Sequence, residues 1–236
     1  MLEGHHLVRD AIDHGHPLEG IYVDGGAPAG DLHAHGVPVH DLEPGVLAKV
    51  SDTITPQAVA AIARMPDEDP GVVDRTIDDG GMVVVLAGVN DPGNAGTLLR
   101  IAEASGVGAV LFCDDSVDPF APKCVRASAG SILHVPVTRG ARSVQVLEAI
   151  GRCGGRRLAA GARRGDPYDR ADLTGPLAVV LGSESRGVPE ALEPALDGWT
   201  HVPMAGRAES LNVGVTGAII CFEAARQRRH TEPANA

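Results

Sequence analysis

The chain has 236 residues, which is enough for one large domain or two small ones. Its formal net charge of −11 argues against nucleic-acid binding through a global basic field, although a local basic patch is compatible with it. Apolar residues make up 44% of the chain and aromatic residues only 3%, so a core must consist mainly of aliphatic side chains, as in α/β proteins.

The cysteines and the apolar segments indicate a cytoplasmic protein. The four cysteines contain no C-x-x-C pair and no secretory signal precedes them, so we expect reduced, partly buried thiols. No apolar run approaches the ~20 residues that span a bilayer, and the N-terminus carries no cationic leader. We therefore expect a cytoplasmic location and no membrane association.

The first 65 residues are predicted to form a small α/β domain. Residues 1–65 hold three basic side chains against nine acidic ones, a net charge of −6. Residues 2–14 place apolar side chains on one helical face and stop before Gly15, which predicts a helix. The further predicted elements are a strand at 20–23, a brief helix at 31–35, a strand at 37–39, a helix at 42–50 and a strand at 58–62.

The next segment has the composition of a linker between domains. Residues 65–71 are acidic and contain two prolines and a glycine. We place the linker at residues 66–76. The chain then divides into a first domain at 1–65, this linker, a second domain at 77–230 and a tail at 231–236.

The second domain begins with the pattern of a strand–helix–strand unit. Residues 82–87 form a continuous apolar run, which is typical of a strand buried on both faces of a parallel sheet. A helix at 97–105, capped by Gly106, and a strand at 109–113 follow. The later predicted elements are a helix at 143–150, strands at 157–161 and 177–181, a short helix at 189–196, an extended segment at 199–203 and a helix at 211–227.

Several common nucleotide, hydrolase and metal motifs are absent from the sequence. Neither lysine follows a glycine, which excludes a P-loop. No G-x-G-x-x-G follows a strand, so a dinucleotide-binding fingerprint is missing, and no G-x-S-x-G nucleophile elbow occurs. The ten histidines form no H-E-x-x-H frame, and we expect no metal site.

Three polar segments remain, and each leaves the end of a predicted strand or extended segment. They are NDPGNAGTLLR at 90–100, LGSESRGV at 181–188 and PMAGRAESLNV at 203–213. Each one by itself could be an ordinary polar loop. Ligands of open α/β sheets bind beyond the carboxyl ends of the strands, and all three segments leave such ends. Together they therefore predict a ligand site.

These three segments resemble the three motifs of the SpoU (TrmH-like) family of RNA ribose 2′-O-methyltransferases, within the SPOUT superfamily. The resemblance covers residues 80–228 in motif order and spacing. The first part, with EGHHLVRDAI and VSDTITPQAVAAIA, is similar to the small ribosomal-protein-like RNA-binding domain often fused before the SpoU domain. One departure is Gly214, where members of the family often have serine.

The resemblance implies an α/β fold with a parallel sheet flanked by helices and a C-terminal deep trefoil knot, preceded by the small α/β ribosomal-protein-like domain. True knots are nearly absent from proteins, so the sequence pattern alone would not suggest one. In this family the knot forms the S-adenosylmethionine pocket. The residues implied to bind this cofactor are Leu181, Gly182, Glu184, Val202, Pro203, Met204, Ser210, Leu211 and Asn212.

The resemblance also implies the catalytic residues. Arg100 is implied as the central one, and the residues implied around it are Asn94, Glu184, Ser210 and Asn212. Arginine is effectively always protonated. We therefore favour a role in which Arg100 grips the target phosphate and stabilises developing alkoxide charge, while a general-base role aided by the phosphate stays open.

The expected partners are RNA and a second copy of the chain, since the family is dimeric. We favour ribosomal over transfer RNA because of the fused first domain. A transfer RNA methyltransferase and a non-catalytic RNA-binding or ribosome-assembly protein on the same scaffold remain as alternatives. The arginines proposed to contact RNA are Arg126, Arg163, Arg164, Arg186 and Arg207.

Overall fold

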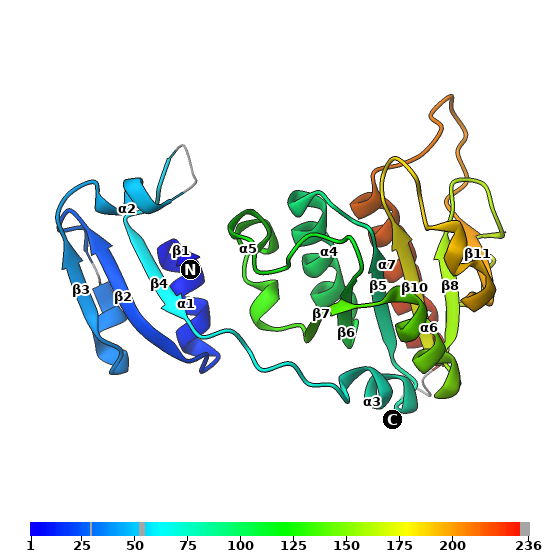
Figure 1. Cartoon of the computed structure of the whole chain (residues 1–236), viewed down its shortest axis with the longest axis horizontal. Coiled ribbons are helices and arrows are strands. Elements are labelled where there is room, and N and C mark those ends of the chain that lie inside the picture. Colours follow the sequence, from blue (N-terminus) through cyan, green and yellow to red (C-terminus); the bar gives the residue numbers. More distant parts are fainter. Residues whose placement is uncertain (29, 52–54, 232–236) are drawn as a thin grey trace. The chain divides into compact units, whose positions relative to one another are not determined.

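The computed structural model describes residues 1–28, 30–51 and 55–231. The chain forms two compact units, Met1–Asp67 and Glu68–Ala236 (Figure 1). Residues 232–236 of the expected tail lie outside the described residues.

The first unit is a four-stranded mixed sheet with the strand order β1-β4-β2-β3. Strand β4 runs antiparallel to both of its neighbours, and β2 and β3 are parallel. Helix α1 buries Leu7, Val8 and Ala11, the apolar face that the sequence pattern predicts. The bounds of the elements are β1 (Leu2–Glu3), α1 (His5–Asp13), β2 (Leu18–Asp24), η1 (Gly30–His35), β3 (Val39–Leu42), α2 (Val46–Val50) and β4 (Val59–Ala63).

The second unit is built on a seven-stranded sheet with the order β7-β6-β5-β10-β8-β11-β9, in which every paired neighbour is parallel. All residues of β5 and β10 are buried, which confirms the two strands predicted from continuous apolar runs. The strands are β5 (Met82–Ala87), β6 (Ala109–Cys113), β7 (Val137–Ala141), β8 (Arg156–Ala160), β9 (Asp166–Pro167), β10 (Leu177–Gly182) and β11 (Gly198–His201).

Helices cover both faces of this sheet, as a buried parallel sheet requires. Alternate residues of β5, Val83 and Val85, pack with Leu147 and Ile150 in one core cluster. The helices on this face are α3 (Val72–Asp78), α6 (Ser143–Arg152) and the 3-10 helix η3 (Glu190–Ala195). The helices that pack together on the other face are α4 (Pro92–Ser105), α5 (Pro122–Ser128), η2 (Ser131–Leu133) and α7 (Val213–Thr231).

Several elements differ from the sequence-based expectation. The expected linker at 66–76 contains the first turns of α3, because Val72 and Ile77 bury an apolar face against the sheet. Helix α5, strand β7 and the two-residue strand β9 were not predicted. The expected helix at 189–196 is a 3-10 helix, and Pro194 lies inside it. These elements are short, so tertiary contacts rather than local patterns determine them.

Helix α4 begins five residues earlier than predicted, and this changes the place of Asn94. The Asp91 side chain accepts a hydrogen bond from the Asn94 backbone N–H at 2.8 Å, which caps the helix, and Pro92 occupies its first turn. Gly96 lets α4 approach α5 closely, because a Cβ there would lie 2.5 Å from the Cβ of Ala127. Asn94 is therefore a residue of the first helical turn rather than of a loop.

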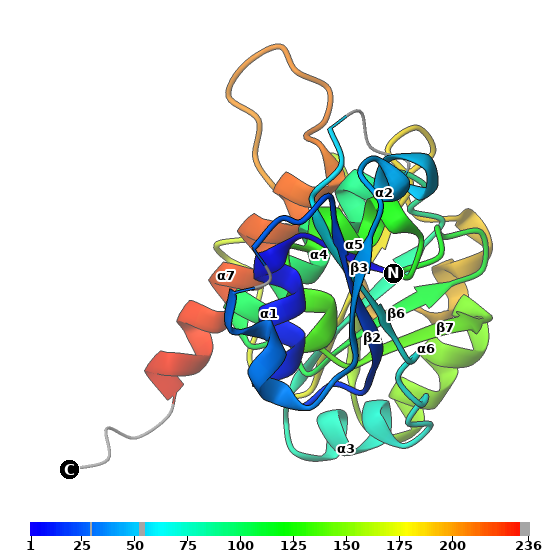
Figure 2. The same cartoon turned by 90° about the vertical axis from the view of Figure 1, so that its left-hand side faces the viewer.

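Helix α7 is held at both of its ends. At the start, the Asn212 Oδ1 accepts hydrogen bonds from the backbone N–H groups of Gly214 at 2.9 Å and Val215 at 3.3 Å. At the far end, the Gln227 side chain accepts from the Leu173 N–H at 2.8 Å, and Arg228 donates to the Gly80 carbonyl at 2.8 Å. The loop that precedes α7 projects beyond the sheet (Figure 1 and Figure 2).

Three of the four cysteines are buried and Cys153 is partly buried. All four cysteines are free, and burial raises the pKa of Cys113, Cys124 and Cys221 to about 12. Among the described residues, no helix combines the length and the apolar character that a membrane span requires.

Candidate active site

The three polar segments meet at the carboxyl edge of the second sheet. The Asn94 side chain on α4 donates a hydrogen bond to Glu184, which lies in the loop after β10. The Asn212 Nδ2, immediately before α7, donates to the Asn94 Oδ1 at 2.9 Å. Residues separated by about a hundred positions in the chain thus form one hydrogen-bonded row, as the strand-end rule predicts.

The backbone N–H groups at the start of α7 determine which atom donates and which accepts in every hydrogen bond of this row. The Gly214 and Val215 backbone N–H groups can only donate, so Asn212 must turn its oxygen toward them. Its amide nitrogen then donates to the Asn94 oxygen, and the Asn94 nitrogen faces the Glu184 carboxylate. The start of helix α7 therefore orients a carboxylate at the exit of β10.

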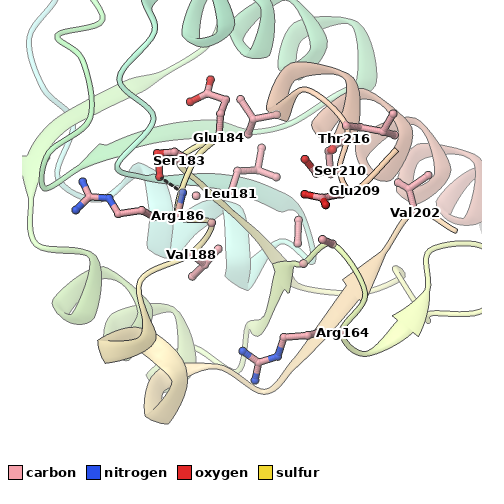
Figure 3. A pocket seen from close by; sticks show the side chains of 18 of the residues that line it. Arg164, Leu181, Ser183, Glu184, Arg186, Val188, Val202, Glu209, Ser210 and Thr216 are labelled. Carbon is pink, nitrogen blue, oxygen red and sulfur yellow. Dashed lines mark hydrogen bonds between the residues drawn. The ribbon is translucent and has the colours of Figure 1, made fainter. Parts of the chain in front are cut away.

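A pocket of about 440 Å³ lies beside this row. Figure 3 shows Glu184 on one side of it, Ser210 and Glu209 on another, and Arg164 at the opposite edge. Its lining comes from β8 and the following turn, from β10 and its exit loop, from β11 and from the segment that leads into α7. The lining residues are Ala160, Gly161, Ala162, Arg164, Leu181, Gly182, Ser183, Glu184, Ser185, Arg186, Gly187, Val188, Trp199, Val202, Met204, Glu209, Ser210, Leu211, Val213 and Thr216.

The loop after β10 is a tight turn that requires glycine at two positions. Ser183 and Gly187 exchange backbone hydrogen bonds at 3.1 and 2.8 Å, and Gly187 adopts a φ of +68°. A Cβ on Gly182 would overlap the backbone of Gly187. The Ser183 hydroxyl accepts from the Arg186 N–H at 3.1 Å, the dashed line in Figure 3. This turn places the exposed Glu184 side chain beside the pocket.

Most of the residues predicted to bind the cofactor lie around this pocket. Those that line it are Leu181, Gly182, Glu184, Val202, Met204, Ser210 and Leu211. Pro203 and Asn212 are adjacent in the chain to lining residues but are not themselves part of the lining.

Sequence reasoning missed one wall of the pocket. Residues 160–162 and Arg164 at the end of β8, together with Trp199 of β11, line it. A signal was present, because β8 is a strand of the same parallel sheet and its exit, GARRG at 161–165, is short and rich in glycine and arginine. Its short length made it resemble an ordinary turn.

Arg100 does not line the pocket. It is exposed on α4, six residues after Asn94, which corresponds to about 9 Å along the helix axis. Within the described part of the chain no hydrogen bond joins it to Asn94, Glu184 or Asn212. The central catalytic role expected for Arg100 therefore stays a prediction, and its side chain is exposed on α4.

The five arginines expected to contact RNA have different surroundings. Arg126 is half-buried on α5, whereas Arg163, Arg186 and Arg207 are exposed in loops. Arg164 forms an ion pair with Glu193 at 2.5 Å, and its guanidinium lies 3.9 Å from the centre of the Trp199 ring. The hydrogen bond from Arg164 lowers the pKa of Glu193.

The fold and the site define a ligand-binding α/β protein with its site at the ends of parallel strands. Residues 81–222 match the model of the SpoU rRNA Methylase family, and residues 1–61 match that of the MRM3-like substrate binding domain. The chain belongs to the SpoU methylase family.

Proteins and structures similar to the chain carry related names. It is 33% identical to the Bacillus subtilis 23S rRNA (guanosine(2553)-2'-O)-methyltransferase RlmP, over 94% of this chain and 86% of that protein. It is 32% identical to the 23S rRNA (guanosine-2'-O-)-methyltransferase RlmB of Ralstonia nicotianae, over 85% and 76%. The structure of the SpoU methyltransferase AviRb from Streptomyces viridochromogenes in complex with AdoMet superimposes with a TM-score of 0.87 at 25% identity, over 98% and 91%.

Proposed function

We propose that this protein methylates a ribose 2′-hydroxyl of ribosomal RNA with S-adenosylmethionine as the methyl donor. The observation that carries the proposal is the hydrogen-bonded row of Asn94, Glu184 and Asn212 beside a pocket at the ends of the parallel strands. Membership of the SpoU family and the names of the related ribosomal RNA methyltransferases support the reaction and the class of RNA.

The pocket has the chemistry that S-adenosylmethionine requires. Its volume of about 440 Å³ lies in the range of small-molecule sites. Val202, Met204 and Leu211 offer partly exposed apolar surface for the adenine ring, and the Glu184 and Glu209 carboxylates suit a ligand that carries positive charge. When bound, this cofactor supplies a methyl group on a sulfonium sulfur.

The residues of the chain would position the ribose and manage its proton. The row from Asn212 through Asn94 fixes Glu184 next to the pocket, where its carboxylate can accept a hydrogen bond from a ribose hydroxyl. Ser210 lines the same pocket and can donate or accept a hydrogen bond. This arrangement would hold the hydroxyl at a fixed place beside the pocket.

Arg100 would act on the phosphate backbone and on the developing alkoxide charge. An exposed, always protonated guanidinium binds phosphate oxygens through paired hydrogen bonds. A bound phosphate at Arg100 would orient the neighbouring ribose toward the pocket, and the positive charge would stabilise the oxyanion. A base role for Arg100, aided by that phosphate, stays open as the second version of this step.

We infer further that the C-terminal chain passes through a loop of the sheet domain to form a deep trefoil knot. Support comes from the close packing around the pocket. Gly182 leaves no room for a Cβ, and a Cβ on Gly217 of α7 would meet Leu98 of α4 and Leu181 of β10. Family membership supports the same topology.

A homodimer is the proposed assembly, with the active site near the subunit interface. Val215 and Phe222 are each 47% exposed and lie seven residues apart on α7, hence on the same helical face. A second copy of the chain is the proposed cover of this face, and it would also bring new groups toward Arg100. Sedimentation of Phe222→Asp should show a monomer where the unchanged chain is dimeric.

RNA would be bound by local arginines rather than by a basic surface. Arg163, Arg186 and Arg207 are exposed in loops around the pocket end of the sheet, and Arg126 on α5 is the fourth candidate. The first unit resembles a substrate-binding domain and is proposed to contribute RNA recognition despite the net charge of −6 over residues 1–65. With ribosomal RNA as the proposed substrate, the proposed location is the cytoplasm.

The decisive experiment combines cofactor binding with mapping of the modified nucleotide. Titration of the full chain with S-adenosylmethionine should show binding, and 2′-O-methyl mapping should reveal one site in ribosomal RNA that depends on the protein. A site found only in transfer RNA would replace the substrate class. Absence of cofactor binding would instead favour a non-catalytic RNA-binding protein on this scaffold.

A further inference from the structure

The turn between β8 and β9 is folded tightly around Trp199, the single tryptophan of the chain. A Cβ on Gly161 would lie 3.0 Å from the Trp199 ring, and a Cβ on Gly165 would overlap its carbonyl group. The Gly161 N–H donates to the Thr200 carbonyl at 2.9 Å, and the His201 Nδ1 lies 3.1 Å from the Gly165 carbonyl oxygen. The turn and β11 therefore behave as one packed wall.

The Arg164 side chain contacts both this wall and a neighbouring helix. Its guanidinium lies 3.9 Å from the centre of the Trp199 ring, within the range of a cation–π contact. The Arg164 Nη1 also forms an ion pair with the Glu193 Oε1 at 2.5 Å. Glu193 belongs to η3, so one side chain connects η3, the turn and β11. Arg164 and Trp199 both line the pocket.

Its neighbour Arg163 has no such partners. Arg163 is exposed in the same turn, and the described residues offer it neither an ion pair nor a ring contact. Both of these adjacent arginines were expected from the sequence to contact RNA. They differ in whether the guanidinium already has partners within the protein. Because one donor group of Arg164 is already paired with a carboxylate and its guanidinium lies on an indole, it is less free than Arg163 to turn toward a phosphate.

We propose that Arg164 is a positioning residue of the cofactor pocket: its ion pair with Glu193 and its stacking on Trp199 fix the pocket wall formed by residues 160–164, and the ligand that depends on it is S-adenosylmethionine rather than RNA. This inference rests on the proposed function. It gives a function to residues 160–164, which lie outside the three sequence motifs.

The test is cofactor binding by the full chain, measured by calorimetry for Arg164→Ala and for its neighbour Arg163→Ala. Both variants lose one exposed positive charge from the same turn. A difference between their cofactor affinities therefore does not come from the change in net charge. Arg164→Ala should bind S-adenosylmethionine about tenfold more weakly, the size expected when a cation–π contact and an ion pair are lost. Arg163→Ala should bind it like the unchanged chain.

Trp199 provides a second readout without any label. Removal of the guanidinium from its ring should shift the emission of the cofactor-free chain in Arg164→Ala but not in Arg163→Ala. Arg164→Lys keeps the charge for Glu193 and loses the planar stack, so its affinity should be intermediate. Far-UV circular dichroism verifies that each variant is folded.

Steady-state kinetics separate positioning from RNA contact. Arg164→Ala should raise the KM for S-adenosylmethionine about tenfold and leave the KM for RNA unchanged. Equal cofactor affinity in the two alanine variants, or a rise confined to the KM for RNA, would overturn the inference while the proposed function stands. No cofactor binding by the unchanged chain would overturn both.

Discussion

The two sides of the pocket are built from different electrostatics. On one side, Asn94 and Asn212 hold Glu184 through neutral amides, and among the described residues no cation pairs with its carboxylate. On the opposite side, Arg164 and Glu193 neutralise each other over the Trp199 ring. The amide-held side keeps a charge available for a ligand, whereas on the ion-paired side the charges of Arg164 and Glu193 compensate each other.

The two sides of the pocket should therefore have different roles, one in the reaction and one in maintaining the shape of the site. A negative charge that is oriented but unpaired can act on a bound ligand, because its interaction is not already used. A paired charge over an aromatic ring mainly restricts side-chain motion. Substitutions on the amide-held side should therefore reduce turnover, and substitutions on the ion-paired side should reduce affinity or stability.

The largest effect is expected from Arg100, which we propose acts on the bound RNA together with the amide-held side. Arg100→Ala should lower kcat by about 10³-fold, because the charge that stabilises the oxyanion is lost. Cofactor affinity should not change, since Arg100 does not line the pocket. Incorporation of labelled methyl groups and a parallel cofactor titration check both points. A variant with full activity would remove Arg100 from the mechanism.

A side chain at position 182 should reduce both the stability of the protein and its cofactor binding. A Cβ there would overlap Gly187, so Gly182→Ala should destabilise the protein by about 3 kcal/mol and abolish cofactor binding. Gly206→Ala is the matched control, because a Cβ at Gly206 meets nothing within 4 Å. Urea unfolding of the two variants gives the comparison. Equal stability would show that the turn after β10 can open.

Asn94→Asp tests the neutrality of the amide-held side directly. The new carboxylate cannot donate to Glu184 and repels it, so kcat should fall by about 10- to 100-fold and the pH at half-maximal rate should rise. Asn90→Asp adds the same charge at an exposed position of the preceding loop and serves as control. A flat pH–rate profile for Asn94→Asp would argue against a functional Glu184 carboxylate.

The smallest effect is expected from a substitution of Asp197, which hydrogen-bonds to Arg157 of β8 and directly precedes β11. The Arg157 backbone N–H and Nε donate to the Asp197 Oδ2 at 2.8 and 2.7 Å, and hydrogen bonding from Arg157 lowers the Asp197 pKa. After allowance for solvent screening, Asp197→Asn should cost about 1 kcal/mol at pH 7 without a change in kcat.

The pH dependence of that cost has a defined sign. A lowered folded-state pKa means that Asp197 contributes stability above its unfolded pKa of about 3.9 and loses it as the pH falls through the folded value. The stability difference between Asp197→Asn and the unchanged chain should therefore shrink below about pH 4. Asp169→Asn, an exposed carboxylate, should show no difference at either pH. A constant difference down to pH 3 would contradict the assignment.

The central strands and the amide-held side could be predicted from sequence because their signals are local. Continuous apolar runs mark β5 and β10, and the polar residues that follow them meet where parallel strands end. The meeting of Asn94, Glu184 and Asn212 needed only that rule and the resemblance to a known family.

The ion-paired side could not be predicted because its contacts are non-local. Arg164, Glu193 and Trp199 come from three short segments whose closeness depends on the order β8-β11-β9 in the sheet. No periodicity in a single segment encodes which parallel strands become neighbours. The start of α4 at Pro92 was likewise missed, since the sequence PGNAG has weak helical propensity and the Asp91 cap and the contact with α5 override it.

The attachment of the far end of α7 has a consequence for how the molecule opens. Gln227 and Arg228 bind this end to Leu173 and Gly80, at the base of the sheet, while Asn212 binds the other end to the active site. The helix up to Arg228 is therefore held at both ends, and we expect this part of α7 to detach as one body. Its amide hydrogens should exchange with solvent at a common rate, and the same event would release Glu184 from its orientation.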